Sequence, residues 1–171
     1  MIKGLATLIF LILVLSMSGL KAQTEEYAPE SNIIYYFTKY VDCPDCMKTG
    51  DFKIGIYGAD RIYDELKKGI TGRRVGSQRI VVFKVDSLSE EKINCSILFI
   101  GSGNIKSIQK IISLTHEKPI LTVTEKEGMI SKGSCMNMVL VGEKISLEIN
   151  RDNIENRGLK IASELLAFKK N

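Results

Sequence analysis

The chain has 171 residues, of which 26% are charged, and its formal net charge is +4. Without a leader that contains Lys3 and Lys21 the charge falls from +4 to +2, and the basic residues that remain are scattered, which argues against nucleic acid as a partner. About 150 residues remain beyond that leader, enough for one hydrophobic core and hardly for two, so we expect a single domain.

The N-terminus has the pattern of a cleavable signal peptide. Lys3 gives a positive start, residues 5–15 are almost entirely apolar, and small residues lead to Ala22. The apolar run is shorter than the roughly 20 residues that a spanning helix needs, which disfavours the alternative of a retained membrane anchor. We expect a periplasmic protein without membrane insertion, divided into a signal peptide (1–22), a polar lead-in (23–30) and one α/β domain (31–171).

Helices and strands alternate after the lead-in. The apolar spacing predicts an amphipathic helix from the N-cap Ser31 to Val41, and a second helix capped by Asp60 that runs to about Lys68. Runs rich in β-branched and aromatic residues predict strands at 52–58, 79–85, 96–100 and 120–124. A helical turn is expected over 89–93, and the basic cluster of Arg73, Arg74 and Arg79 is interpreted as a solvated loop.

The region that follows the third strand predicts a third helix, a hairpin and a final helix. The helix is expected over 104–114, with Ile105, Ile108, Ile111 and Ile112 on its inner face. Strands at 136–141 and 144–150 flank Gly142 and Glu143, which is typical of a hairpin. The final helix is expected to open at Asp152 or Asn153 and to carry five apolar residues, namely Ile154, Leu159, Ile161, Leu165 and Leu166.

Strands that look buried and alternate with helices are typical of parallel sheets covered on both faces. The C-terminal hairpin adds antiparallel pairing to this arrangement. We therefore expect a three-layer α/β fold that has a mainly parallel sheet, a C-terminal antiparallel hairpin, and helices on both faces.

The cysteines favour disulfides, because their number is even and the expected compartment is oxidising. The candidates are Cys43, Cys46, Cys95 and Cys135. Four cysteines allow three pairings, and we prefer a Cys43–Cys46 bridge together with a Cys95–Cys135 bridge. A bridge from the C-x-x-C pair to Cys95 is the alternative, since all three precede strands at one edge of a parallel sheet.

The C-x-x-C pair Cys43-Pro44-Asp45-Cys46 also allows a thiol oxidoreductase. Such enzymes place the pair at the start of a helix, whose dipole stabilises the thiolate, whereas this pair follows a helix and precedes a strand. Zinc would need thiolates from two such pairs. No metal and no cofactor are therefore expected.

Two further features bear on function. The turn Gly101-Ser102-Gly103-Asn104 lies between a strand and a helix, where backbone amides can hold an anion, although a tight turn accounts for these glycines equally well. The third glycine of a dinucleotide fingerprint is missing. His116, the only histidine, has no partner nearby in the sequence for metal binding or catalysis, so we expect a binding protein rather than an enzyme.

The order of these segments and their amino-acid sequences resemble those of the YfiR family of exported bacterial proteins. The similarity spans the mature chain and is strongest at its end, in Ile149-Asn150, Arg157-Gly158-Leu159 and Ile161. The other matching segments are 33–41, 52–58, Gly72 with Arg73 and 80–82, 95–100, 119–124, and Gly128 with Gly133 and Asn137. Where the family often has Trp-Pro, this chain has Cys43-Pro44.

The resemblance implies a periplasmic regulator that represses an inner-membrane signalling protein by binding its periplasmic sensor region. That partner would be a diguanylate cyclase, acting in cyclic di-GMP signalling, or a sensor kinase. The resemblance also implies homodimers and stabilising disulfides. The alternatives are a periplasmic small-ligand-binding protein that uses the carboxyl edge of the strands near Gly58, Gly101 and Glu125, or the thiol oxidoreductase that uses Cys43 and Cys46.

Overall fold

The computed structural model describes residues 29–44, 48–89, 91–141 and 144–168. The expected signal peptide, most of the lead-in and Cys46 lie outside the described residues, and so does the hairpin tip at Gly142 and Glu143. Across the described ranges, no helix combines the length and the apolar character that crossing a membrane requires.

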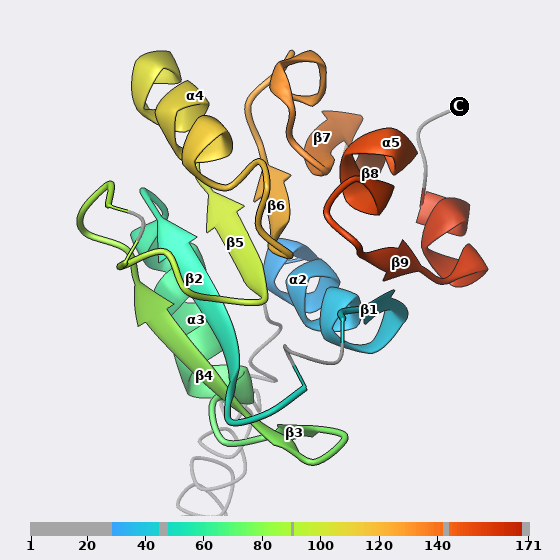
Figure 1. Cartoon of the computed structure of the whole chain (residues 1–171). Helices are drawn as coiled ribbons and strands as arrows, with labels where there is room; N and C mark the ends of the chain where they lie inside the picture. The colour runs from blue at the N-terminus through green and yellow to red at the C-terminus, as the bar shows by residue number, and fades with distance from the viewer. Residues whose placement is uncertain (1–28, 45–47, 90, 142–143, 169–171) are drawn as a thin grey trace, which may run out of the picture.

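A seven-stranded sheet organises the fold, in the order β3-β4-β2-β5-β6-β7-β8 (Figure 1). The five central strands run parallel, whereas β3 and β8 add antiparallel edges. The strands are β2 (Phe52–Tyr57), β3 (Arg74–Val75), β4 (Gln78–Lys84), β5 (Ile97–Ile100), β6 (Leu121–Thr124), β7 (Met136–Val141) and β8 (Lys144–Ile149). The predicted parallel sheet with its C-terminal antiparallel hairpin is confirmed.

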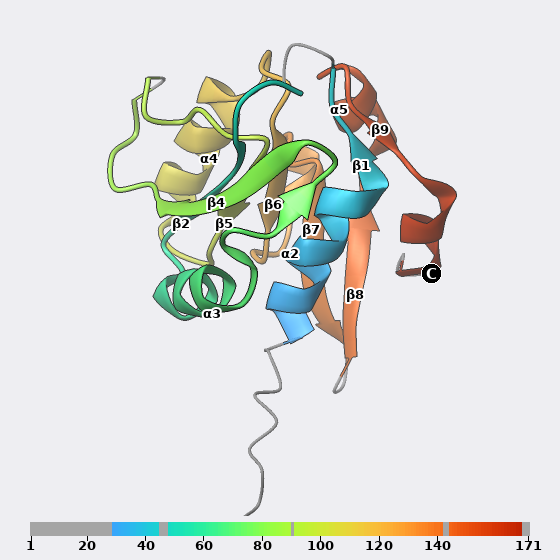
Figure 2. The ribbon, with the colours of Figure 1, turned by 90° about the horizontal axis from the view of Figure 1, so that it is seen from below.

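Helices cover both faces of this sheet, as predicted (Figures 1 and 2). Helices α2 (Pro29–Tyr40) and α3 (Asp60–Ile70) pack on one face, and α4 (Ile105–Leu114) packs on the other. The buried residues of α3 are Ile62, Leu66 and Ile70, which lie four apart and so share one face of the helix. The sheet therefore separates two hydrophobic clusters.

Strand β5 lies at the centre of the sheet and is buried throughout. Ile97 and Phe99 point into the cluster beneath α2 and α3, whereas Leu98 and Ile100 point into the cluster beneath α4. Side chains alternate between the two faces of a strand, so a strand that is covered on both faces needs apolar residues at every position. This is the physical reason for the continuous apolar run at 97–100.

Three predicted helix details are wrong. Ser31 lies inside α2 rather than at its N-cap, and its hydroxyl donates a hydrogen bond to Glu65 Oε2 over 2.7 Å. Asp60 is the first residue of α3, and its carboxylate lies 2.7 Å from Lys84 Nζ. Ile105 is 47% exposed instead of buried, because it stands in the first turn of α4, away from the sheet.

The single final helix is also wrong, because the chain turns soon after it begins. Helix α5 (Arg151–Glu155) is short, and Gly158 then adopts a φ of +70°, a conformation that favours glycine. The chain continues as β9 (Lys160–Ile161) and a 3-10 helix, η4 (Ser163–Phe168). Strand β9 pairs antiparallel with β1 (Val41–Asp42), so the last segment joins the end of α2 rather than extending α5.

Two leucines of the sheet should differ sharply in how much they contribute to stability. Leu98 is fully buried in β5, so Leu98→Ala should lower the free energy of unfolding by about 3 kcal/mol through the cavity it leaves. Leu140, in β7, is 75% exposed, and Leu140→Ala should change it by less than about 0.5 kcal/mol. Urea unfolding measures both, and equal losses would contradict the described sheet.

Candidate functional site

The carboxyl ends of β2, β5 and β6 meet at one edge of the sheet, which is where open α/β sheets commonly bind ligands. The turn after β5 packs tightly against the turn after β2. Gly101 donates a backbone hydrogen bond to Tyr57 over 2.9 Å, and a Cβ on Gly101 would lie only 2.3 Å from the Gly58 carbonyl oxygen. Close packing alone therefore requires glycine at position 101.

The expected anion-binding turn, Gly101-Ser102-Gly103-Asn104, uses its polar groups within the chain. The Ser102 amide donates to Glu125 Oε1 over 2.8 Å, so a carboxylate of this protein occupies the place where an anion would bind. Asn104 caps α4, and its side chain accepts a hydrogen bond from the Lys106 amide over 2.8 Å. This arrangement favours the alternative interpretation, a tight turn that positions Glu125.

An apolar and acidic groove lies beside this turn, and we call it the edge groove. It has a volume of about 270 Å³, and it is lined by Glu30, Ser102, Glu125, Met138, Val139, Leu140 and Ile145. Leu140 is the most exposed large apolar side chain of the described residues, at 75%. The Oε1 atom of Glu30 lies 3.4 Å from Arg61, while its buried Oε2 atom has no hydrogen-bond partner in the described part of the chain.

A buried polar network supports the groove from beneath, where parallel pairing gives way to the hairpin. The Thr124 hydroxyl donates to Asn137 Oδ1 over 2.8 Å, and the Asn137 amide donates to Glu148 Oε2 over 3.0 Å. Ser134 donates to the Met136 carbonyl over 2.8 Å. No sequence pattern indicated this network, although Asn137 is among the residues that carry the family resemblance.

Arg157 is a buried cation held by backbone carbonyls of three other segments. Its guanidinium donates to Thr115 at the end of α4, to Ile120 before β6, and to Gly133 after η3 (Ile130–Lys132). Only 5% of the residue is exposed, and burial lowers the pKa of the guanidinium from its ordinary value. Arg157 therefore fixes the C-terminal segment against the rest of the fold.

The structure contradicts the preferred Cys95–Cys135 bridge. Both are buried thiols, and they belong to different hydrophobic clusters, so the sheet separates them. The Cys135 thiol donates to the Asn153 carbonyl over 3.7 Å. Cys43 is buried beside β1, and its proposed pairing with Cys46 lies outside the described residues.

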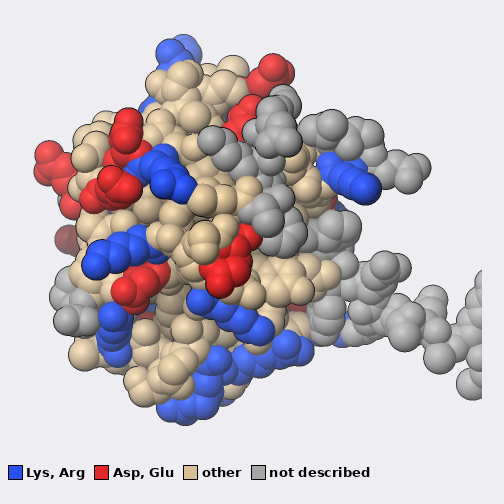
Figure 3. Space-filling view, turned by 90° about the vertical axis from the view of Figure 1, so that its right-hand side faces the viewer, with Lys and Arg blue, Asp and Glu red and all other residues tan. Residues whose placement is uncertain are grey.

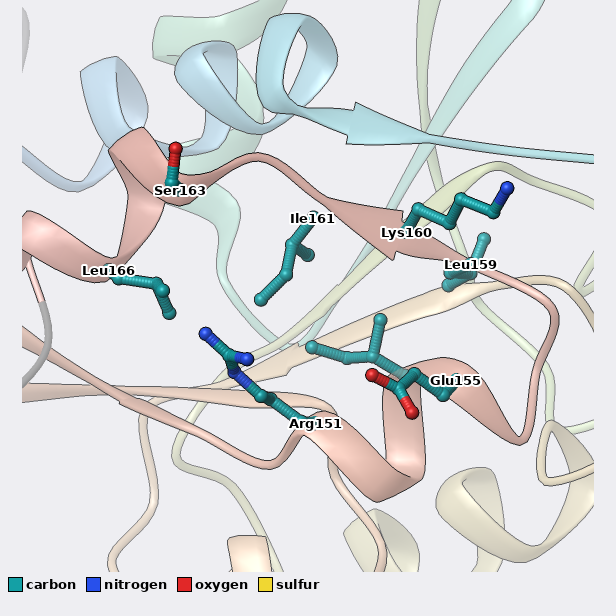
Figure 4. A pocket seen from close by; sticks show the side chains of 8 residues that line it. Arg151, Glu155, Leu159, Lys160, Ile161, Ser163 and Leu166 are labelled. Carbon is teal, nitrogen blue, oxygen red and sulfur yellow. The ribbon is translucent and has the colours of Figure 1, made fainter.

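A second hollow lies between the three elements of the C-terminal segment, and we call it the C-terminal pocket (Figure 4). Its volume is about 340 Å³, and it is lined by Arg151, Ile154, Glu155, Leu159, Lys160, Ile161, Ser163 and Leu166. Figure 4 shows the Arg151 side chain reaching from α5 toward Leu166 and Ile161, while Lys160 points away. No sequence motif indicated this pocket, because its walls come from an expected helix that the fold divides into three elements.

Charge is distributed over the surface without a single dominant sign (Figure 3). Basic side chains gather along the lower margin of the face in Figure 3, and acidic and basic side chains alternate above them. Arg73, Arg74 and Arg79 are exposed, as expected, but only Arg73 lies in a loop, whereas Arg74 belongs to β3 and Arg79 to β4. The Arg73 guanidinium lies over the Tyr35 ring, 5.4 Å from its centroid. His116 is exposed after α4, and the described residues hold no cluster of three or more metal-binding side chains.

The sequence matches the family described as YfiR/HmsC-like over residues 27–168. Among solved structures, the fold is similar to that of a conserved domain protein from Vibrio cholerae O1 biovar El Tor, with a TM-score of 0.59 and 12% sequence identity. The similarity covers 83% of this chain and 59% of that one, so this chain spans less than two thirds of its length. At this identity the likeness shows the fold alone.

Arg157 should be essential for stability. Arg157→Met removes the guanidinium from three backbone carbonyls, of which Thr115 keeps only the Lys118 amide as a donor. We expect the free energy of unfolding to fall by about 2–4 kcal/mol. The matched control is Arg151→Met, since Arg151 is exposed and should contribute less than about 0.5 kcal/mol. Urea unfolding of both variants measures the difference. An Arg157→Met protein as stable as the control would contradict the stabilising role of the hydrogen bonds from Arg157 to the backbone carbonyls.

Cys95 should make the free energy of unfolding depend on pH under alkaline conditions. Burial raises the pKa of its thiol from 9.0 to about 12, so the folded state holds the proton more tightly than the unfolded state does. The stability that this contributes is fully present below about pH 9 and is lost as the pH rises toward about 12. Unfolding at about pH 8 and about pH 10.5 should show a larger loss for the wild type than for Cys95→Ala. Equal losses, or a disulfide at Cys95 in peptide maps, would contradict the buried thiol.

Proposed function

Because the chain belongs to the YfiR/HmsC-like family of periplasmic regulators in cyclic di-GMP signalling, we propose that it represses an inner-membrane signalling protein by binding its periplasmic sensor region. The partner is a diguanylate cyclase or, as the alternative, a sensor kinase. The protein acts without catalysis of its own, and binding is its activity.

The observation that carries this proposal is the edge groove. Its rim holds Leu140, a large apolar side chain that is 75% exposed, and exposed apolar surface with a polar rim is characteristic of protein-binding sites. Glu30 and Glu125 make the same groove acidic. We propose that it receives an apolar side chain of the sensor region that is flanked by basic residues, because those groups complement both parts of the groove.

Repression then follows from a difference in affinity. The sensor region exchanges between an active and an inactive conformation. A regulator can shift this equilibrium only by as much as its affinities for the two conformations differ. The regulator binds the inactive conformation more tightly, and a signal that weakens this complex restores the output. The buried network of Thr124, Asn137 and Glu148 keeps the groove wall in one register, so that the binding surface is preorganised.

Three further properties belong to this proposal. The leader at residues 1–22 directs export and is removed, residues 23–30 form a lead-in, and the domain follows. Helix α2 begins at Pro29, so the last two lead-in residues are already helical. The regulator works as a homodimer in the periplasm, and a Cys43–Cys46 bridge stabilises it.

Leu140→Asp is the sharpest test of docking. It places a charge at the exposed apolar rim of the groove without disturbing the core, so affinity for the partner's sensor region should fall by at least about tenfold. Ser77→Asp is the matched control, because Ser77 is exposed at the β3–β4 hairpin, which is built on the opposite edge of the sheet.

The measurement is binding of the purified mature protein to sensor regions of membrane cyclases and kinases encoded beside its gene, with light scattering to establish its oligomeric state. Binding that is lost in Leu140→Asp and kept in Ser77→Asp supports the proposal. No binding to any of these sensor regions, or equal binding by both variants, would remove it.

A further inference from the structure

The C-terminal pocket combines apolar walls with one cation that faces them, Arg151, because the Lys160 side chain points away. Ile154 and Leu159 are buried at 1% exposure each, and they form its floor together with the half-buried Ile161 and Leu166. Such a surface binds a hydrocarbon chain through the hydrophobic effect.

Arg151 supplies the charge. Its side chain is exposed on α5, and no carboxylate among the described residues lies within ion-pair distance of it, Glu155 included. Figure 4 shows its guanidinium directed toward the side chains of Ile161 and Leu166. An arginine fork matches a carboxylate with two parallel hydrogen bonds, so the group it favours is a carboxylate at the end of an apolar chain.

We propose that the C-terminal pocket binds a small amphipathic carboxylate, with its carboxylate on Arg151 and its chain along Ile154, Ile161 and Leu166. A volume of about 340 Å³ accommodates about ten heavy atoms, taking roughly 30 Å³ for a water-sized group. Octanoate has this size and this chemistry. Because the pocket is shallow and only one cation faces its apolar floor, we expect a dissociation constant of about 0.1–1 mM.

The pocket lies where a ligand would fix the C-terminal segment against the N-terminal helix. Ile161 lines the pocket and pairs with Val41 of β1, and the Ala162 amide donates to the Tyr40 carbonyl over 2.9 Å. A ligand that bridges α5 and η4 therefore stiffens the junction between β9 and the end of α2. Its role as an effector of repression rests on the proposed function, whereas the binding site itself does not.

The test uses the purified protein with octanoate, and the methyl NMR signals of Ile161 and Leu166 report binding. Octanoate should shift these signals saturably, and 1-octanol, which keeps the chain and lacks the charge, should bind at least about tenfold more weakly. Arg151→Gln should reduce octanoate to the affinity of octanol. Arg79→Gln, at an exposed arginine of β4, is the matched control and should bind as the wild type does.

Two more variants separate the charge from the apolar floor. Leu166→Gln should weaken octanoate and octanol alike, and Glu155→Gln should tighten octanoate about twofold, since it removes a negative charge from the rim. The proposal is overturned if octanoate gives no saturable shift at Ile161 and Leu166, or if Arg151→Gln binds it as tightly as the wild type. The sensor-region experiment has no bearing on these outcomes, so the two proposals fail separately.

Discussion

The buried guanidinium of Arg157 is the interaction on which the C-terminal third of the structure depends. A cation with 5% exposure is costly unless its hydrogen-bonding groups are satisfied, and here backbone carbonyls of Thr115, Ile120 and Gly133 satisfy it. Because these carbonyls belong to three different segments, Arg157 holds the end of α4, the start of β6 and the turn after η3 at fixed distances from α5. After Arg157 the chain turns at Gly158 and continues as β9, and this is the course it takes away from α5.

That course produces the C-terminal pocket, one of the two surfaces to which function is assigned. Strand β9 pairs with β1, and the space between α5, β9 and η4 becomes the C-terminal pocket. On the other side, the hairpin of β7 and β8 is held in register by Thr124, Asn137 and Glu148, and it carries the exposed Leu140 at the edge groove. The two sites are built from different elements, so a ligand in one does not occupy the other.

The parallel core could be predicted from the sequence because its signals are local and repeated. The apolar run at 97–100 and the spacing of Ile62, Leu66 and Ile70 each require burial on particular faces, and the structure places them there. The family resemblance at Arg157-Gly158-Leu159 pointed to this segment, but it did not indicate which backbone carbonyls Arg157 binds. The cysteine pairing failed because an even count says nothing about which face of the sheet each thiol occupies, and Cys95 and Cys135 lie on opposite faces.

The sequence by itself determined the α/β class, the positions of the longer strands and the family, since each follows from hydrophobic periodicity or from a run of residues in register. The two-residue strands β1, β3 and β9 were not predicted. Only the tertiary structure decided the course of the chain after α5, the carbonyl partners of Arg157, and the full set of residues that line the edge groove and the C-terminal pocket. Apolar residues at 154–166 satisfy the spacing of a helix, but Gly158 breaks that helix, and pairing with β1 stabilises an extended strand instead. Long-range contacts of this kind leave no periodic signal in the sequence, which is why the C-terminal pocket became visible only in the folded chain. The edge groove was indicated in part, through Ser102 and Glu125 at the carboxyl ends of the strands.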